Sequence, residues 1–324
     1  VSVPLLYGGT WTLFRHMLPR QGIEVRFAKS DRAEDLAALI DEKTTAVFCE
    51  SSGNPAGNIV DLEALADMAH DRGVPLIVDN TVATPALIKP IDWGADVVVN
   101  SLTKYMGGHG NALGGMIVEG GEFPWKDFPE KFHMLNTPEA SYHGVVYTDV
   151  FGAAAFAGRA RTVALRNTGA ALSPMNAFLI LQGMQTLPLR MERHCDNALA
   201  VARYLAEHPM VSWVRFAGLP DSPYFDLAQK YTEGRPSALL TFGIRGGFDA
   251  GVKFYDALQL FLRLVNIGDT KSLAAHPAST THRQLSAAEL ETAGVTPDMI
   301  RLCIGIEDIE DIIADLDQAL DAAR

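Results

Sequence analysis

Apolar runs alternate with helical patterns through the first third of the chain. Two amphipathic stretches, at 32–42 and 61–73, separate some of these runs. Such alternation is typical of strands joined by helical crossovers, which build a largely parallel sheet. Asp61 can cap the second stretch and Gly73 can end it, so we expect a helix there. The apolar runs expected to form strands lie at residues 24–28, 46–50, 75–80, 97–102 and 114–120.

The pattern changes twice further along the chain. Residues 120–145 are rich in proline, glycine and aromatic residues, and we expect a long surface excursion near the site or at a subunit contact. A helical pattern after residue 187 leads to strand-like runs and a last helix with an apolar stripe from Ile309 to Leu320. We therefore expect a large domain at 1–186 and a smaller α+β C-terminal domain at 187–324.

Composition excludes several classes of protein. The chain has 324 residues, 48% of them apolar, and a formal net charge of -12, so it can bury a large core but repels phosphate backbones and acidic membranes. We expect no nucleic-acid or membrane partner. Three cysteines without CxxC spacing and scattered histidines without HExxH predict no disulfide framework and no metal site. A reducing cytoplasm fits best.

The beginning of the chain is unusual. It lacks an initiator methionine and opens on VSVPLLYGG, which is typical of the inside of an element. We expect that a segment upstream of Val1 is missing, so the sequence says little about targeting.

The stretch VVVNSLTKYMGGHGNALGG places a lysine, Lys104, just after a predicted strand. Ligands of open α/β sheets bind at the carboxyl ends of the strands, where Asp79 also falls. A desolvated lysine has a lowered pKa and can form a Schiff base with a carbonyl, and a nearby carboxylate can keep a ring nitrogen protonated. These requirements describe pyridoxal phosphate, whose phosphate Ser101 and Thr103 could bind. Taken singly, an Asp or Lys at a strand end is usually only a solvated loop residue.

A set of motifs resembles one known family. YGGT, ESSGNPAGNIVD, VDNTVATP, SLTKYMGGHG, SYHGVVY, HPASTTHRQLS and RLCIGIEDIEDIIADL follow one another from residue 7 to the end. Together they resemble the cysteine and methionine metabolism family of pyridoxal-phosphate enzymes. The resemblance implies an aspartate-aminotransferase-like α/β fold (fold type I), with a mainly parallel sheet, helices on both faces and a smaller C-terminal domain.

The resemblance also implies the roles of several residues in the first half of the chain. Lys104 would hold the cofactor as a Schiff base, and Asp79 would face the pyridine nitrogen. Ser101 and Thr103 match the phosphate contacts. Tyr7 matches a tyrosine that stacks on the cofactor ring and takes part in proton transfer.

Further matches concern the substrate. Asn54 matches an asparagine near the ring hydroxyl and the substrate carboxylate, Arg301 an arginine that binds that carboxylate, and Ser272 a further contact to it. Cys303 stands where the family usually has serine. The family's phosphate-binding glycine loop and the residues lent to a neighbouring subunit would lie upstream of YGGT, and a dimer of dimers is implied.

The implied activity is a γ-replacement that makes homocysteine from O-acetylhomoserine and sulfide. A γ-lyase, a cystathionine γ-synthase or an O-succinylhomoserine sulfhydrylase of the same family would share every motif, so the acyl group and the thiol acceptor stay open. A subunit that only supports assembly would not need Tyr7, Asp79, Lys104 and Arg301 together. A dehydrogenase is disfavoured because GGHGNALGG does not match GxGxxG.

Overall fold

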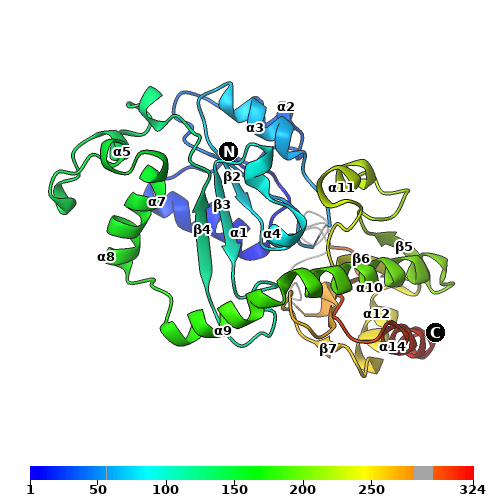
Figure 1. Ribbon diagram of the computed structural model, residues 1–324. Coiled ribbons are helices and arrows are strands. Elements are labelled where there is room, and N and C mark those ends of the chain that lie inside the picture. Colours follow the sequence, from blue (N-terminus) through cyan, green and yellow to red (C-terminus); the bar gives the residue numbers. More distant parts are fainter. Residues whose placement is uncertain (56, 281–294) are drawn as a thin grey trace. The chain divides into compact units, whose positions relative to one another are not determined.

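The computed structural model describes residues 1–55, 57–280 and 295–324 of the chain. These residues form two compact units, which are described separately (Figure 1). Unit 1 comprises residues 1–51, 60–102 and 113–179, and unit 2 comprises residues 52–59, 103–112 and 180–324. The predicted domain boundary after residue 186 stays a prediction.

The sheet of unit 1 has the order β1-β2-β3-β4 (Figure 1). The parallel strands β1 (Val47–Glu50), β2 (Leu76–Asp79) and β3 (Val97–Ser101) are followed by β4 (Gly115–Glu119), which runs antiparallel to β3. Val47, Leu76 and Val97 are buried, as expected of parallel strands covered on both faces. The alternating apolar runs therefore predict this largely parallel sheet correctly.

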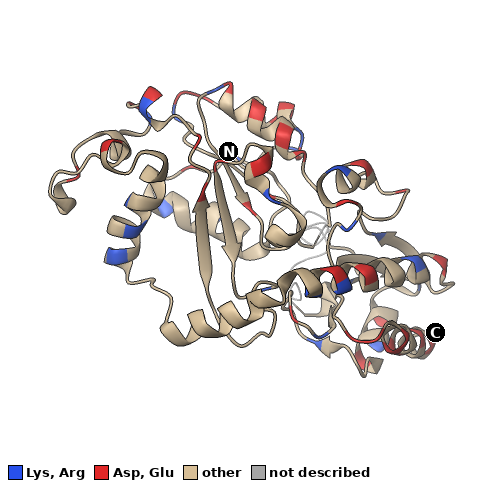
Figure 2. Ribbon diagram, in the orientation of Figure 1, with Lys and Arg blue, Asp and Glu red and all other residues tan. Residues whose placement is uncertain are grey.

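Helices follow the strands of unit 1. In α3 (Leu62–His70) the Asp61 side chain accepts a hydrogen bond from Ala64 N at 3.4 Å, as the capping pattern predicts. Figure 2 marks acidic residues on the ribbons of α2 and α3, in keeping with the negative net charge. The other helices of this unit are α1 (Gly8–Thr12), α2 (Ala33–Ala37), α4 (Thr84–Leu87), α5 (His133–Asn136), α6 (Tyr147–Val150), α7 (Ala155–Arg159) and α8 (Arg166–Thr168), and α9 (Pro174–Gln185) begins here.

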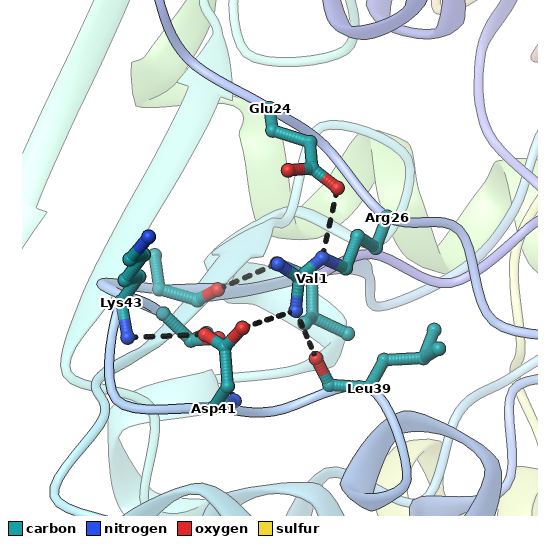
Figure 3. A network of polar contacts seen from close by, with 8 residues as sticks. Val1, Glu24, Arg26, Leu39, Asp41 and Lys43 are labelled. Carbon is teal, nitrogen blue, oxygen red and sulfur yellow. Dashed lines mark hydrogen bonds and ion pairs between the residues drawn. The ribbon is translucent and has the colours of Figure 1, made fainter.

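The strand predicted at 24–28 is wrong. Phe27 forms only an isolated bridge with Ser2, and polar contacts hold the segment instead. Arg26 donates to Glu24 Oε1 at 2.9 Å, to Asp41 Oδ2 at 2.7 Å and to Leu39 O at 3.0 Å (Figure 3). A guanidinium that bridges to a neighbouring loop supports the segment without a ladder of backbone hydrogen bonds.

Residues 120–145 contribute to a hydrophobic cluster. The side chains of Phe123, Trp125 and Leu135 are buried, and they form one cluster with Tyr147 and Ala155. The Trp125 indole also donates to Glu119 Oε1 at 2.9 Å. The expectation of a surface excursion is therefore wrong for these aromatic residues, because they stabilise unit 1 by burial. Its expected place near the site or at a subunit contact stays a prediction.

Unit 2 contains a mixed sheet with the order β5-β6-β9-β8-β7. Its strands are β5 (Val211–Arg215), β6 (Leu239–Ile244), β7 (Leu262–Arg263), β8 (Leu273–Ala275) and β9 (Met299–Cys303). Its helices are α10 (Leu187–Glu207), α11 (Phe225–Thr232), α12 (Gly247–Ala257) and α14 (Ile309–Ala322). Helices α10 and α12 pack on β6, and α14 packs on both of these helices. The predicted α+β character is confirmed.

The apolar stripe of α14 packs as its spacing predicts, since Ile312, Leu316 and Leu320 are buried. In the part of the chain that the structure describes, no helix is long and apolar enough to cross a membrane.

Candidate active site

The first group of candidate residues lies at the carboxyl ends of the parallel strands in unit 1. Asp79 ends β2 and Ser101 ends β3, and these strands are neighbours. Glu50 ends β1 in register with Asp79. Glu50 Oε1 accepts a hydrogen bond from Tyr7 N at 2.6 Å, which brings the tyrosine to this edge. In open α/β sheets, ligands bind outside the carboxyl ends of the strands, so these side chains stand where a ligand is expected.

Thr81 joins the ends of β2 and β3. Its backbone N–H donates to Asp79 Oδ1 at 2.9 Å, and its hydroxyl oxygen accepts from Ser101 N at 2.8 Å. Sequence reasoning missed both Thr81 and Glu50, because Thr81 contacts Ser101 and Glu50 contacts Tyr7 over long separations in the chain. Polar residues at the ends of predicted strands are the signal that could have found them.

Burial raises the pKa of the Asp79 carboxyl, although its hydrogen bond with Thr81 opposes the shift. Among the described residues, no lysine or arginine forms an ion pair with Asp79. A desolvated carboxylate without a protein cation is the acceptor that a protonated ring nitrogen requires.

The second group lies in unit 2 around Lys104. The Lys104 amine donates to the side-chain oxygen of Asn266. Arg301, which is buried, donates to Asn266 O at 3.1 Å, to Val265 O at 2.9 Å and to Asn54 Oδ1 at 3.3 Å. Asn266 therefore connects the lysine to the predicted carboxylate-binding arginine. Sequence reasoning missed Asn266, which lies 162 residues from Lys104 in the chain.

The surroundings lower the pKa of Lys104. Burial is the largest cause, the positive charge of Arg301 adds to it, and Cys303 opposes it. The described hydrogen-bond partner of the amine, Asn266, is a neutral amide and not a carboxylate. A lowered pKa increases the fraction of neutral amine, which is the form that attacks carbonyl carbon.

The turn that carries Lys104 is closely packed. Gly108 N donates to Lys104 O at 2.8 Å and closes the turn. The Tyr105 hydroxyl bonds with Cys303 Sγ at 3.1 Å, and that sulfur accepts from Gly268 N at 3.3 Å. Cys303 is buried, and its thiol takes part in both polar contacts at the position where the family usually has serine.

The Ser272 hydroxyl bonds with Glu307 and Gly305. Its side chain is buried, its hydroxyl donates to Glu307 Oε2 at 2.9 Å, and its oxygen accepts from Gly305 N at 2.8 Å. The single hydroxyl proton is thus already used within unit 2. The predicted contact between Ser272 and a substrate carboxylate stays a prediction that would require this hydrogen bond to break. Thr103 is partly buried beside Lys104 in the chain.

These residues fit pyridoxal phosphate. Lys104 supplies an amine with a lowered pKa, Asp79 a buried carboxylate, and Ser101 and Thr103 hydroxyl donors on one short segment. The motif HPASTTHRQLS extends over residues 281–286, which lie outside the described residues.

Comparison with known proteins supports this interpretation. Residues 1–321 match the family described as Cys/Met metabolism PLP-dependent enzyme. O-acetyl-L-homoserine sulfhydrylase 1 of Thermus thermophilus is 51% identical over 322 residues, 99% of this chain and 76% of that protein. Homocysteine synthase of Schizosaccharomyces pombe is 50% identical over 324 residues, all of this chain and 76% of that protein.

Solved structures agree. A Campylobacter jejuni protein, whose crystal structure contains N'-pyridoxyl-lysine-5'-monophosphate, matches with a TM-score of 0.92 and 42% identity, over 99% of this chain and 76% of its own. O-acetylhomoserine sulfhydrylase of Wolinella succinogenes matches with a TM-score of 0.85 and 36% identity, over 98% of this chain and 84% of its own. The predicted aspartate-aminotransferase-like architecture agrees with these neighbours, and the chain belongs to the Cys/Met metabolism family of PLP-dependent enzymes.

Proposed function

We propose that this chain makes homocysteine from O-acetylhomoserine and sulfide. In this γ-replacement the bond between Cγ and the ester oxygen breaks, acetate leaves, and a bond from Cγ to sulfur forms. Family membership and relatives named as sulfhydrylases or homocysteine synthases at about half identity support the proposal. The observation that carries it is the Lys104 amine, which has a lowered pKa. This amine and Arg301 both donate hydrogen bonds to the same residue, Asn266.

Lys104 is the proposed base and proton carrier. Pyridoxal phosphate, when bound, supplies an electron-accepting ring that stabilises the negative charge left on the substrate carbon after a proton is removed. The Lys104 amine takes the α proton and moves the β proton. One amine can serve both positions because they are neighbours on the substrate and the side chain is flexible.

The residues of unit 1 hold the cofactor in this proposal. Asp79 keeps a negative charge at the ring nitrogen, because a desolvated carboxylate interacts strongly with a buried cation. Tyr7 stacks on the ring and assists proton transfer. Ser101 donates a hydroxyl hydrogen bond to the phosphate, and Thr103 of unit 2 donates another.

Arg301 and Asn54 bind the substrate carboxylate in this proposal. Arg301 offers a planar fork of N–H donors, which suits a carboxylate better than the point charge of a lysine. Asn54 Oδ1 accepts from Arg301 at 3.3 Å and so orients the guanidinium. Ser272 is a weaker candidate because its hydroxyl donates to Glu307.

Trapping of the cofactor on a defined lysine tests the proposed site. Borohydride reduction of the cofactor-loaded protein, followed by peptide mapping, should find a pyridoxyl group on Lys104. Lys104→Ala should lose both the trapped group and activity. Lys253→Ala, at an exposed lysine of α12, is the matched control and should retain both. A pyridoxyl group on another lysine in the wild-type protein would contradict the proposal.

Product analysis tests the reaction. With sulfide, O-acetylhomoserine should give homocysteine and acetate in equal amounts. Release of 2-oxobutanoate and ammonia without sulfide would indicate a γ-lyase instead. Cystathionine from added cysteine, or faster turnover of O-succinylhomoserine, would assign the chain to the other reactions of the family.

We also propose an oligomeric state and a cellular location for the protein. A dimer of dimers is proposed, and exposed apolar side chains on α9 such as Met175 (65% exposed) and Phe178 (55% exposed) offer surface for it. Sedimentation of the cofactor-loaded protein tests the oligomeric state. A cytoplasmic location is proposed because all three cysteines are buried free thiols, which suits a reducing compartment.

A further inference from the structure

Arg190 is a buried cation beside the turn that carries Lys104. It belongs to α10 and is 5% exposed. Within the described part of the chain, no carboxylate forms an ion pair with it. A buried arginine without a carboxylate is costly unless neutral acceptors satisfy its N–H groups. Its partners should therefore reveal why the charge is there.

The partners of Arg190 are three main-chain carbonyls and one side-chain hydroxyl. Nη1 donates to Tyr105 O at 2.7 Å, and Nη2 donates to Met106 O at 3.3 Å and to Gly183 O at 2.8 Å. Nε donates to Thr186 Oγ1 at 3.2 Å. Two of these carbonyls belong to the residues directly after Lys104. The Gly108 N–H donates to Lys104 O and closes this turn. The guanidinium binds the two residues inside the turn, Tyr105 and Met106.

Two glycines make room for this arrangement. A Cβ built on Gly108, which has φ +77°, would lie 2.6 Å from Arg190 Cζ. A Cβ built on Gly183 would overlap Gly107 O. Gly108 thus leaves space for the guanidinium, and Gly183 leaves space for Gly107 of the turn. The turn therefore packs closely against Arg190 of α10 and against Gly183 of α9.

A second residue of α10 contacts the same turn. His194, one helical turn after Arg190, packs edge-on against the Tyr105 ring at 5.3 Å between centroids. Tyr105 itself is fully buried. The turn is consequently held through its carbonyls by Arg190 and through the Tyr105 ring by His194.

We propose that Arg190 is a positioning residue for the Lys104 amine, which it orients by fixing the carbonyls of Tyr105 and Met106. The inference rests on the proposed function, in which Lys104 bears the cofactor and moves protons. Small displacements of a reacting group cost large factors in rate, so a residue that fixes the main chain beside the amine controls turnover without touching substrate.

The test compares variants of two arginines on the same helix. Arg190→Gln removes the charge and the fork, Arg190→Lys keeps the charge, and Arg193→Gln changes an exposed arginine as the matched control. Each cofactor-loaded variant is characterised by the absorbance of its lysine-linked chromophore against pH, by kcat and KM, and by its unfolding midpoint.

We expect Arg190→Gln to shift the midpoint of the absorbance titration by at least about half a pH unit. It should lower kcat by about 10- to 100-fold while KM changes by less than about threefold. Arg190→Lys should lie between Arg190→Gln and the wild type, and Arg193→Gln should match the wild type. An Arg190→Gln variant with a wild-type titration and kcat would overturn the inference, even if its unfolding midpoint fell.

Two further measurements keep the outcome decisive. If Arg190→Gln does not fold, Arg190→Lys and Thr186→Val, which removes the acceptor of Nε, replace it, and wild-type titrations in both would overturn the inference. Peptide mapping of the trapped wild-type protein separates the two proposals. A pyridoxyl group absent from Lys104 refutes the proposed function, whereas its presence there with an unchanged Arg190→Gln refutes only the role of Arg190.

Discussion

Gly268 packs directly against the main chain of Lys104. A Cβ built on Gly268 would lie 2.8 Å from Lys104 C and 2.9 Å from Lys104 Cβ, closer than real side chains approach. Gly268 has φ +74°, in the left-handed region, and its N–H donates to Cys303 Sγ. The glycine is therefore required both by its backbone conformation and by the proximity of the lysine.

A substitution at Gly268 should destabilise the protein because of the close approach to Lys104. Gly268→Ala combines an unfavourable φ with overpacking, so we expect a loss of about 2–4 kcal/mol of unfolding free energy. Gly247, with φ +68° and no atom within 4 Å of a built Cβ, is the control, because Gly247→Ala should cost about 1 kcal/mol from backbone strain alone. Urea unfolding measures both losses. Equal losses in the two variants would show that the contact with Lys104 is unimportant.

Arg301 should control substrate affinity rather than cofactor binding. Arg301→Lys keeps a positive charge but loses the planar fork, so we expect KM for O-acetylhomoserine to rise about 10-fold or more, since a bidentate pair is replaced by a point charge. The absorbance of the bound cofactor should not change. Arg263→Lys, at an exposed arginine paired with Asp256, should leave KM unaltered. A normal KM in Arg301→Lys would rule out the proposed contact.

Asp79 should lower the stability of the cofactor-free protein at pH 7 but should be needed for activity. Since burial raises its pKa in the folded chain, stability from this group is present below its unfolded pKa and is lost as pH rises through the folded value. Asp79→Asn keeps an oxygen for the Thr81 N–H and removes the ionisable group. We expect the cofactor-free variant to be more stable than the wild type at pH 7, and the loaded variant to have lost most of its activity.

Thermal unfolding without cofactor and turnover with it measure these two effects. Asp92→Asn, at a carboxyl outside both groups of candidate residues, serves as the control and should change neither. Normal turnover in Asp79→Asn would mean that this carboxylate does not serve the ring nitrogen.

The sequence allowed some of these positions to be predicted. Asp79 and Ser101 follow apolar runs long enough to be buried strands, so their place at the strand ends could be inferred from local pattern. The run at 24–28 has the same pattern but forms only one isolated bridge, and the Arg26 side chain bonds with Asp41 of a neighbouring loop. The local sequence pattern could not show that this run forms no strand.

Residues that act over long sequence separations could not be predicted. Asn266 contacts Lys104 from 162 residues away, and Arg190 contacts Tyr105 from 85 residues away. In the sequence, Arg190 is one of several arginines on an amphipathic helix, and nothing local distinguishes it from the exposed Arg193. Only the packed structure shows which guanidinium meets the carbonyls of the turn.

His194 should make the protein sensitive to acid. Its Nδ1 donates to Ile304 O at 2.7 Å, and among the described residues its buried Nε2 has no hydrogen-bond partner. Burial lowers the pKa of His194 to about 4, and the Arg190 charge contributes to that shift. The unfolded chain binds this proton more readily, so stability should fall as pH drops from about 6.5, the unfolded value.

The measurement is the unfolding free energy of the wild type and two variants between pH 4 and pH 8. His194→Asn keeps a donor for Ile304 O but cannot titrate, so its stability relative to the wild type should rise on acidification by up to about 3 kcal/mol. His70→Gln should behave oppositely, because the hydrogen bond with Asp96 raises the pKa of His70, and that stabilisation is present below pH 6.5 and lost above it. Parallel pH profiles for the wild type and His194→Asn would mean that His194 is protonated as readily in the folded protein as in the unfolded chain.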